Sequence, residues 1–169
     1  SNKQFDIYGN LSATFVRDLT AKVGLSYKNY NMLYFFVNSP LDQTEFLVAY
    51  DDGNTGWTTF TGEVMYSKTK LFRTGLSMRW DNYALGNIAA AYHRPSLKTS
   101  FLATYNLYDK ISFNTDIYYI SGLTALNPLS FEPQNMNSIV DMNIKVDYRF
   151  TKKLSSFVEF NNLLGKSYE

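Results

Sequence analysis

Hydrophobic and polar side chains alternate with a period of two residues along most of this chain. Over residues 140–150 the even positions are apolar or aromatic, and the odd positions are all polar or charged. The same split recurs over residues 7–15 and 21–28. Because successive side chains of a strand point to opposite faces of a sheet, this period predicts strands with one apolar and one polar face.

The pattern predicts ten strands and no stable helix. The segment 85–92 is short and contains Gly86, which favours a loop or the entry to a strand. We therefore predict an all-β fold, an antiparallel up-and-down meander of about ten strands. The predicted strands are 5–17, 20–29, 32–38, 44–51, 57–68, 70–83, 97–107, 111–121, 138–150 and 154–162.

The connections between these strands fall into two kinds. Four are short and polar, "RDLTAK", "SKTKLF", "NLYDKI" and "RFTKKL", whereas "DNYALGNIAAAYHRPS" and "SGLTALNPLSFEPQNMNS" are long. In an antiparallel meander alternate connections lie at opposite ends, so the four short turns are expected at one end. This requires a reversal at residues 29–31 and a further short turn at "SPLD" on the tight-turn end.

Strand length and aromatic placement favour a barrel that crosses a membrane. Several strands have roughly 11–14 residues, more than the usual five or six of globular strands and enough for the about 9–11 of a tilted transmembrane strand. Aromatic residues near strand ends match the girdles of outer-membrane barrels, so we expect the chain to lie in the outer membrane of a Gram-negative bacterium. These residues are Tyr27, Tyr30, Tyr66, Tyr83, Tyr105, Tyr119, Tyr148 and Phe150.

Mid-strand charges support the same assignment. A lipid-exposed Arg or Lys at the bilayer centre costs about 2–4 kcal/mol, so charges should keep to one face. Arg73 and Arg79 share a strand face and could attract an anionic ligand, although pairing with Glu63 and Asp81 is favoured. The candidate lumen-facing residues are Glu63, Arg73, Arg79, Asp116, Lys145, Asp147, Arg149 and Glu159.

Composition excludes several classes of site. The chain has 16 basic and 15 acidic residues and therefore no nucleic-acid footprint. Without cysteine, it can form neither a disulfide nor a thiolate metal site, and its single histidine excludes a multi-histidine metal site.

No catalytic, cofactor-binding or metal-binding residue is predicted, and the chain is not expected to be an enzyme. His93 has no recognisable catalytic partner, so a loop or rim position is favoured. The segment "YDDGNTG" lacks the downstream Glu of a calcium loop, so a hairpin turn with Gly53 and Gly56 is favoured.

Two other functions stay open at this point. A soluble lipocalin-like β-barrel that binds an apolar ligand inside would show the same alternation, because a soluble sheet also has two unlike faces. An outer-membrane enzyme is disfavoured, since no paired catalytic constellation is visible.

The C-terminal hairpin carries a resemblance. "YRFTKKLSSFVEFNNLLGKSYE" resembles the penultimate hairpin of TonB-dependent receptors, especially those of Bacteroidetes, and "YNLYDKISFNTDIYYISG" is similar to an upstream hairpin of the same barrels. The matching positions are Asn162, Leu163, Leu164, Gly165, Lys166 and Tyr168. The resemblance implies a barrel of about 22 strands filled by an N-terminal plug, with TonB engaging the plug, and a parent protein that takes up a nutrient.

Residues 1–169 are accordingly expected to be a single β-barrel segment without a plug, a TonB box or the closing strand. The segment would supply wall and extracellular loops, with unpaired edges at residues 5–17 and 154–162 that favour association. Its expected partners are outer-membrane lipids, the rest of the barrel and the plug, TonB through the parent protein, and a surface lipoprotein over the loops.

Overall fold

The chain folds as an all-β protein dominated by one antiparallel sheet. The computed structural model describes residues 4–39, 41 and 45–165, and that part contains twelve strands and no helix. No helix in the described part is long and apolar enough to span a membrane. The predicted antiparallel all-β fold class is confirmed.

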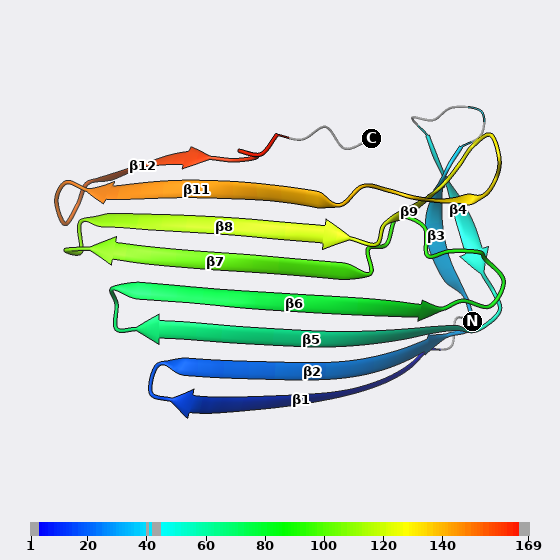
Figure 1. Ribbon diagram of the computed structural model, residues 1–169, viewed down its shortest axis with the longest axis horizontal. Helices are drawn as coiled ribbons and strands as arrows, with labels where there is room; N and C mark the ends of the chain where they lie inside the picture. The colour runs from blue at the N-terminus through cyan, green and yellow to red at the C-terminus, as the bar shows by residue number, and fades with distance from the viewer. Residues whose placement is uncertain (1–3, 40, 42–44, 166–169) are drawn as a thin grey trace.

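Eight strands form the main sheet, in the order β1-β2-β5-β6-β7-β8-β11-β12 (Figure 1). Every neighbouring pair is antiparallel. β1 and β12 are its edges within the described residues, as predicted. The strands are β1 (Gln4–Val16), β2 (Leu19–Tyr30), β5 (Thr55–Lys68), β6 (Phe72–Ala84), β7 (Leu97–Leu107), β8 (Ile111–Ser121), β11 (Ile139–Arg149) and β12 (Ser155–Phe160).

The short and long connections lie at opposite ends of this sheet. Figure 1 shows the turns β1–β2, β5–β6, β7–β8 and β11–β12 at one end, and the long connections at the other. The β7–β8 turn places Tyr108 and Asp109 at φ 52° and 55°, the left-handed pair that suits the twist of a tight hairpin. The predicted grouping of the four turns is confirmed.

The prediction for the segment between β2 and β5 is partly wrong. β3 (Leu33–Asn38) and β4 (Phe46–Asp51) exist, but they pair only with each other, and β2 pairs directly with β5. This hairpin lies at the long-connection end (Figure 1), so "SPLD" does not turn at the tight-turn end. Pro40 and residues 42–44 lie outside the described residues. A two-strand hairpin inserted between β2 and β5 reverses the chain twice and leaves the direction of every later strand unchanged. The alternation of strand directions is therefore the same whether β3 and β4 belong to the main sheet or form a separate pair.

The connection between β8 and β11 holds two strands that the sequence pattern missed. β9 (Thr124–Leu126) and β10 (Pro133–Asn135) form a separate antiparallel pair. Three residues are too few to establish a period of two, so alternation gave no signal here.

The long connections pack together at their end of the sheet, and we call residues 31–54, 85–96 and 122–138 the loop cap. The cap contains a small apolar core. It consists of Leu33, Phe35, Val37 and Tyr92, packed against Tyr30, Ala49, Leu85, Ile88, Ala90, Ala91 and Leu126.

The strand register aligns like positions across the main sheet and gives it an apolar face and a polar face. One apolar row runs through Ala21, Val64, Leu76, Phe101, Ile117 and Met142, one residue per strand. The apolar face is open: Leu76 is 50% exposed and Phe101 39%. In the described part of the chain the buried apolar residues belong to the cap, whereas the main sheet buries polar-face residues such as Thr59 and Asp81.

Candidate functional site on the polar face and the loop cap

The register places all eight predicted charged residues on the polar face. Lys145, for example, lies opposite Glu159 on β12 and Asn114 on β8, and Asn114 lies opposite Thr104, which in turn faces Arg73. Ion pairs form on this face between Lys22 and Glu63 (3.2 Å), Lys28 and Asp6 (3.4 Å), and Lys145 and Asp147 (3.3 Å).

Of the two arginine pairs that were favoured from the sequence, one is present. Arg79 binds Asp81. Glu63 instead pairs with Lys22, which lies directly opposite it on β2, while Arg73 directs its Nε to the sulfur of Met65 (3.3 Å). The prediction of an Arg73–Glu63 pair is wrong because Arg73 lies opposite Ser67, four residues along β5 from Glu63.

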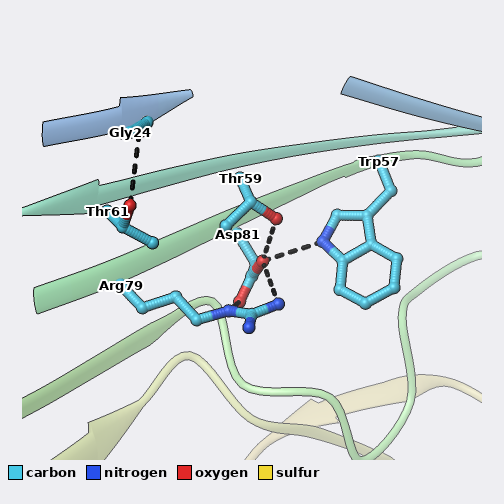
Figure 2. A network of polar contacts seen from close by, with 6 residues as sticks. All are labelled: Gly24, Trp57, Thr59, Thr61, Arg79 and Asp81. Carbon is cyan, nitrogen blue, oxygen red and sulfur yellow. Dashed lines mark hydrogen bonds and ion pairs between the residues drawn. The ribbon is translucent and has the colours of Figure 1, made fainter. Parts of the chain in front are cut away.

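Asp81 is the centre of the most elaborate polar cluster of the face (Figure 2). Its carboxylate is 4% exposed and accepts hydrogen bonds from Thr59 Oγ1 (2.6 Å) and Trp57 Nε1 (2.8 Å). Arg79 donates from Nε (2.7 Å) and from Nη2 (3.1 Å). Charge-assisted bonds of this bidentate kind fix both partners, so the arginine head is held in one orientation.

Aromatic and cationic side chains surround Trp57 beside this cluster. Its ring lies 5.3 Å from that of Tyr83 and 6.3 Å from that of Tyr30. Lys28, Arg79 and Arg94 each place a cationic group within 6 Å of its centroid, at 5.8, 5.7 and 5.5 Å.

The placement of Tyr30 and Tyr83 in an aromatic girdle is therefore wrong. Both stand on the polar phase of their strands, since Tyr83 lies opposite Trp57 and Tyr30 opposite Thr55. Nearness to a strand end does not determine which face of the sheet a residue occupies.

The segment "YDDGNTG" joins two parts of the cap. β4 and β5 do not pair, so the predicted hairpin turn with Gly53 and Gly56 is wrong. Asp51 is fully buried and accepts bonds from Thr55 Oγ1 (2.5 Å), Gly86 N (2.9 Å) and Asn87 N (2.6 Å). The second carboxylate, Asp52, accepts a bond from the amide of Asn87.

These bonds determine the ionisation of Asp51. Desolvation works to raise its pKa, but the hydrogen bonds from Thr55 and from the backbone N–H groups of Gly86, Asn87 and Ile88 outweigh it and hold the pKa below its ordinary value. The carboxylate is thus an anchor for loop 85–96. No group of three or more potential metal ligands occurs in the described part of the chain.

His93 joins three segments of the cap, consistent with the loop position favoured from the sequence. Its Nε2 lies 2.9 Å from Asn38 Oδ1, and its ring meets Phe46 edge-on at 5.2 Å. Its backbone N–H donates to Thr124 O (2.9 Å). Burial lowers the pKa of the imidazole.

The residues that carry the C-terminal resemblance form a docked segment beside β11. Asp141, 3% exposed, accepts bonds from Tyr118 Oη (2.9 Å) and Leu164 N (3.2 Å). The side-chain amide of Asn162, assigned from its surroundings, donates to Asp141 Oδ2 (2.8 Å). Leu163 N bonds Met142 O (3.0 Å), and Lys166 and Tyr168 lie outside the described residues.

Comparison with known proteins shows a structural likeness and no family. No family model matches the chain, and no curated protein matches it. Among solved structures it is similar to the copper transporter OprC, with a TM-score of 0.75 and 14% sequence identity over 99% of this chain. The match covers 26% of the transporter, so this chain spans about a quarter of that protein's length. The likeness shows the fold alone, a sheet related to the β-barrel of a transporter.

Proposed function

We propose that this chain forms wall and extracellular loops of an outer-membrane nutrient-uptake transporter of the TonB-dependent receptor type in a Gram-negative bacterium. Its work is architectural, with no catalytic step. The apolar face contacts lipid, the polar face lines the aqueous lumen, and the loop cap lies over the outer mouth.

One observation carries the proposal: the apolar side of the sheet is the open side. Val64 and Leu76 are 46% and 50% exposed, while Thr59, Asp81 and Asp141 on the other face are 7%, 4% and 3% exposed. A lipocalin-like barrel turns its apolar face inward around a ligand, which is the reverse arrangement. Hydrocarbon is the solvent that suits an exposed apolar band on hydrogen-bonded strands of this length.

The structural likeness supports the same proposal at the level of fold. A chain that matches a quarter of a transporter fits a segment of a larger barrel, with lipids at one face and the remaining strands at its edges. A plug, TonB and a surface lipoprotein are the further partners that we propose through the parent protein. Copper is not carried over to this chain, since identity of 14% shows no shared ligand.

Spin labels on the two faces test the wall assignment. The chain has no cysteine, so Leu76→Cys and Ser77→Cys each create a single labelling site on adjacent, opposite-facing positions of β6. In proteoliposomes the label at 76 should be relaxed by oxygen, which partitions into lipid, and the label at 77 by a water-soluble nickel chelate. Equal relaxation at both positions, or the reverse assignment, would contradict the proposal.

Cell fractionation and cross-linking test the location and the receptor type. The parent protein should sediment with outer-membrane markers, and in-cell cross-linking should recover TonB. A monomer in the periplasmic fraction would instead support the lipocalin-like reading, and outer-membrane protein without TonB would leave only a porin-like transporter.

A further inference from the structure

Two cations face each other on the polar face near the loop cap. Arg79 on β6 and Lys98 on β7 are direct cross-strand partners, and Lys98 is exposed. Like charges at directly opposite positions destabilise an antiparallel pair. An anion bound between them would remove this repulsion.

The carboxylates around this pair are already engaged. Asp81 binds Arg79, Asp6 binds Lys28, and Glu63 binds Lys22. Lys98 makes no ion pair in the described part of the chain.

Arg94 adds a further positive charge without a carboxylate partner there. Its Nη2 donates to Tyr34 O (3.0 Å), and its Cζ lies 4.8 Å from the centroid of Phe35. The neighbourhood of Trp57 and Lys98 therefore carries an excess of positive charge.

Arg79 is prepared to bind a further anion. Two of its nitrogens are bound to Asp81, and Figure 2 shows the remaining terminal nitrogen directed away from that carboxylate. Its side chain is 44% exposed while that of Asp81 is 4% exposed. A guanidinium already held in one orientation loses little conformational entropy on binding.

Arg79 also borders a hollow of a size that suits a small solute. This hollow of about 330 Å³ is lined by Arg79 and Lys28 together with Asp6, Thr59 and Thr61, and Lys98 lies outside its lining. Arg79 and Lys98 together line a second depression of about 620 Å³, which shares Thr61 with the first and also includes the paired Lys22 and Glu63. Pockets of roughly 300 Å³ and more hold small ligands.

We propose that Arg79 and Lys98 form a subsite for an oxyanion, a carboxylate or phosphate group of the transported solute. This inference rests on the proposed function, since it names the chemical class of solute that the polar face would accept. Lys98 supplies an unpaired charge, and Arg79 supplies a fixed hydrogen-bond donor beside it.

Tryptophan fluorescence can report binding at this place. The chain has two tryptophans, and Trp80 stands on the apolar face opposite Phe60, so Trp80→Phe leaves Trp57 as the single reporter next to Arg79. In detergent micelles, inorganic phosphate and citrate should each change its emission saturably, while chloride at equal ionic strength should not. Lys98→Gln and Arg79→Gln should each weaken the response at least tenfold.

Arg73→Gln is the matched control, because Arg73 shares the strand and face of Arg79 but lies near the tight-turn end and has no carboxylate partner in the described part. It should leave the response unchanged. An equal response to chloride, or binding unaffected by Lys98→Gln, would overturn the subsite. The spin-label experiment uses no anion, so either proposal can fail while the other stands.

Discussion

Single residues decide how closely the loops of the cap approach each other. Gly53 and Gly86 meet backbone to backbone: a Cβ built on Gly86 would lie 2.4 Å from both Cα and O of Gly53. Backbone atoms held by the bonds of Asp51 cannot move aside as a flexible side chain would. The close contact of these two loops therefore depends on the absence of side chains at both positions.

Gly86→Ala should loosen the cap while leaving the main sheet folded. We expect a cost of about 1–3 kcal/mol, the usual range for overpacking a tight contact. Limited proteolysis should show faster cleavage within residues 85–96. The gel migration of the unheated, folded protein should stay unchanged. Gly9→Ala is the control, because nothing lies within 4 Å of a Cβ at that position. Equal cleavage of both variants would show that the contact is unimportant.

At the scale of elements, His93 connects loop 85–96 to β3 and β4. The groups around its ring are the amide of Asn38 and the ring of Phe46, neither of which is charged. Burial therefore lowers the pKa of the imidazole below its ordinary value of 6.5. The unfolded segment takes up a proton at higher pH than the folded cap, so the contribution of His93 to stability is complete above pH 6.5 and declines as pH falls.

An NMR titration can measure this directly, because the chain contains a single histidine. The imidazole of the folded chain in micelles should titrate below that of the urea-unfolded chain. Cleavage of the cap by a protease should increase as pH falls through the same interval, and His93→Gln should remove that dependence. A folded pKa at or above the unfolded one would refute the burial argument.

The alternation of side chains was sufficient to predict the eight strands of the main sheet, since each is long enough for the period of two to repeat. The same rule found β3 and β4 but assigned them to the wrong sheet, because alternation records local geometry and not the partner of a strand. The cluster at Asp81 was predicted only as an Arg79 pair. The contributions of Trp57 and Thr59 depend on cross-strand register, which the sequence alone did not supply.

At the scale of the whole molecule, the two faces of the sheet should respond oppositely to charge. Phe101 and Ser100 are neighbours near the middle of β7 on the apolar and polar face respectively. Phe101→Lys should destabilise the protein in lipid vesicles by about 2–4 kcal/mol, whereas Ser100→Lys should cost much less. Urea unfolding, monitored by the different gel migration of the folded and the unfolded protein, would measure both losses of stability. Similar losses for the two variants would argue against a lipid boundary on the apolar face.

The register between β2 and β5 has a consequence for how such a protein diversifies. Tyr30 and Thr55 are direct partners, although 24 residues separate them in the chain. The β3–β4 hairpin and its connections therefore leave the main sheet after Tyr30 and rejoin it at Thr55, its direct partner. The length and composition of this segment can therefore change during evolution by a local insertion or deletion, without shifting the pairing between strands of the main sheet.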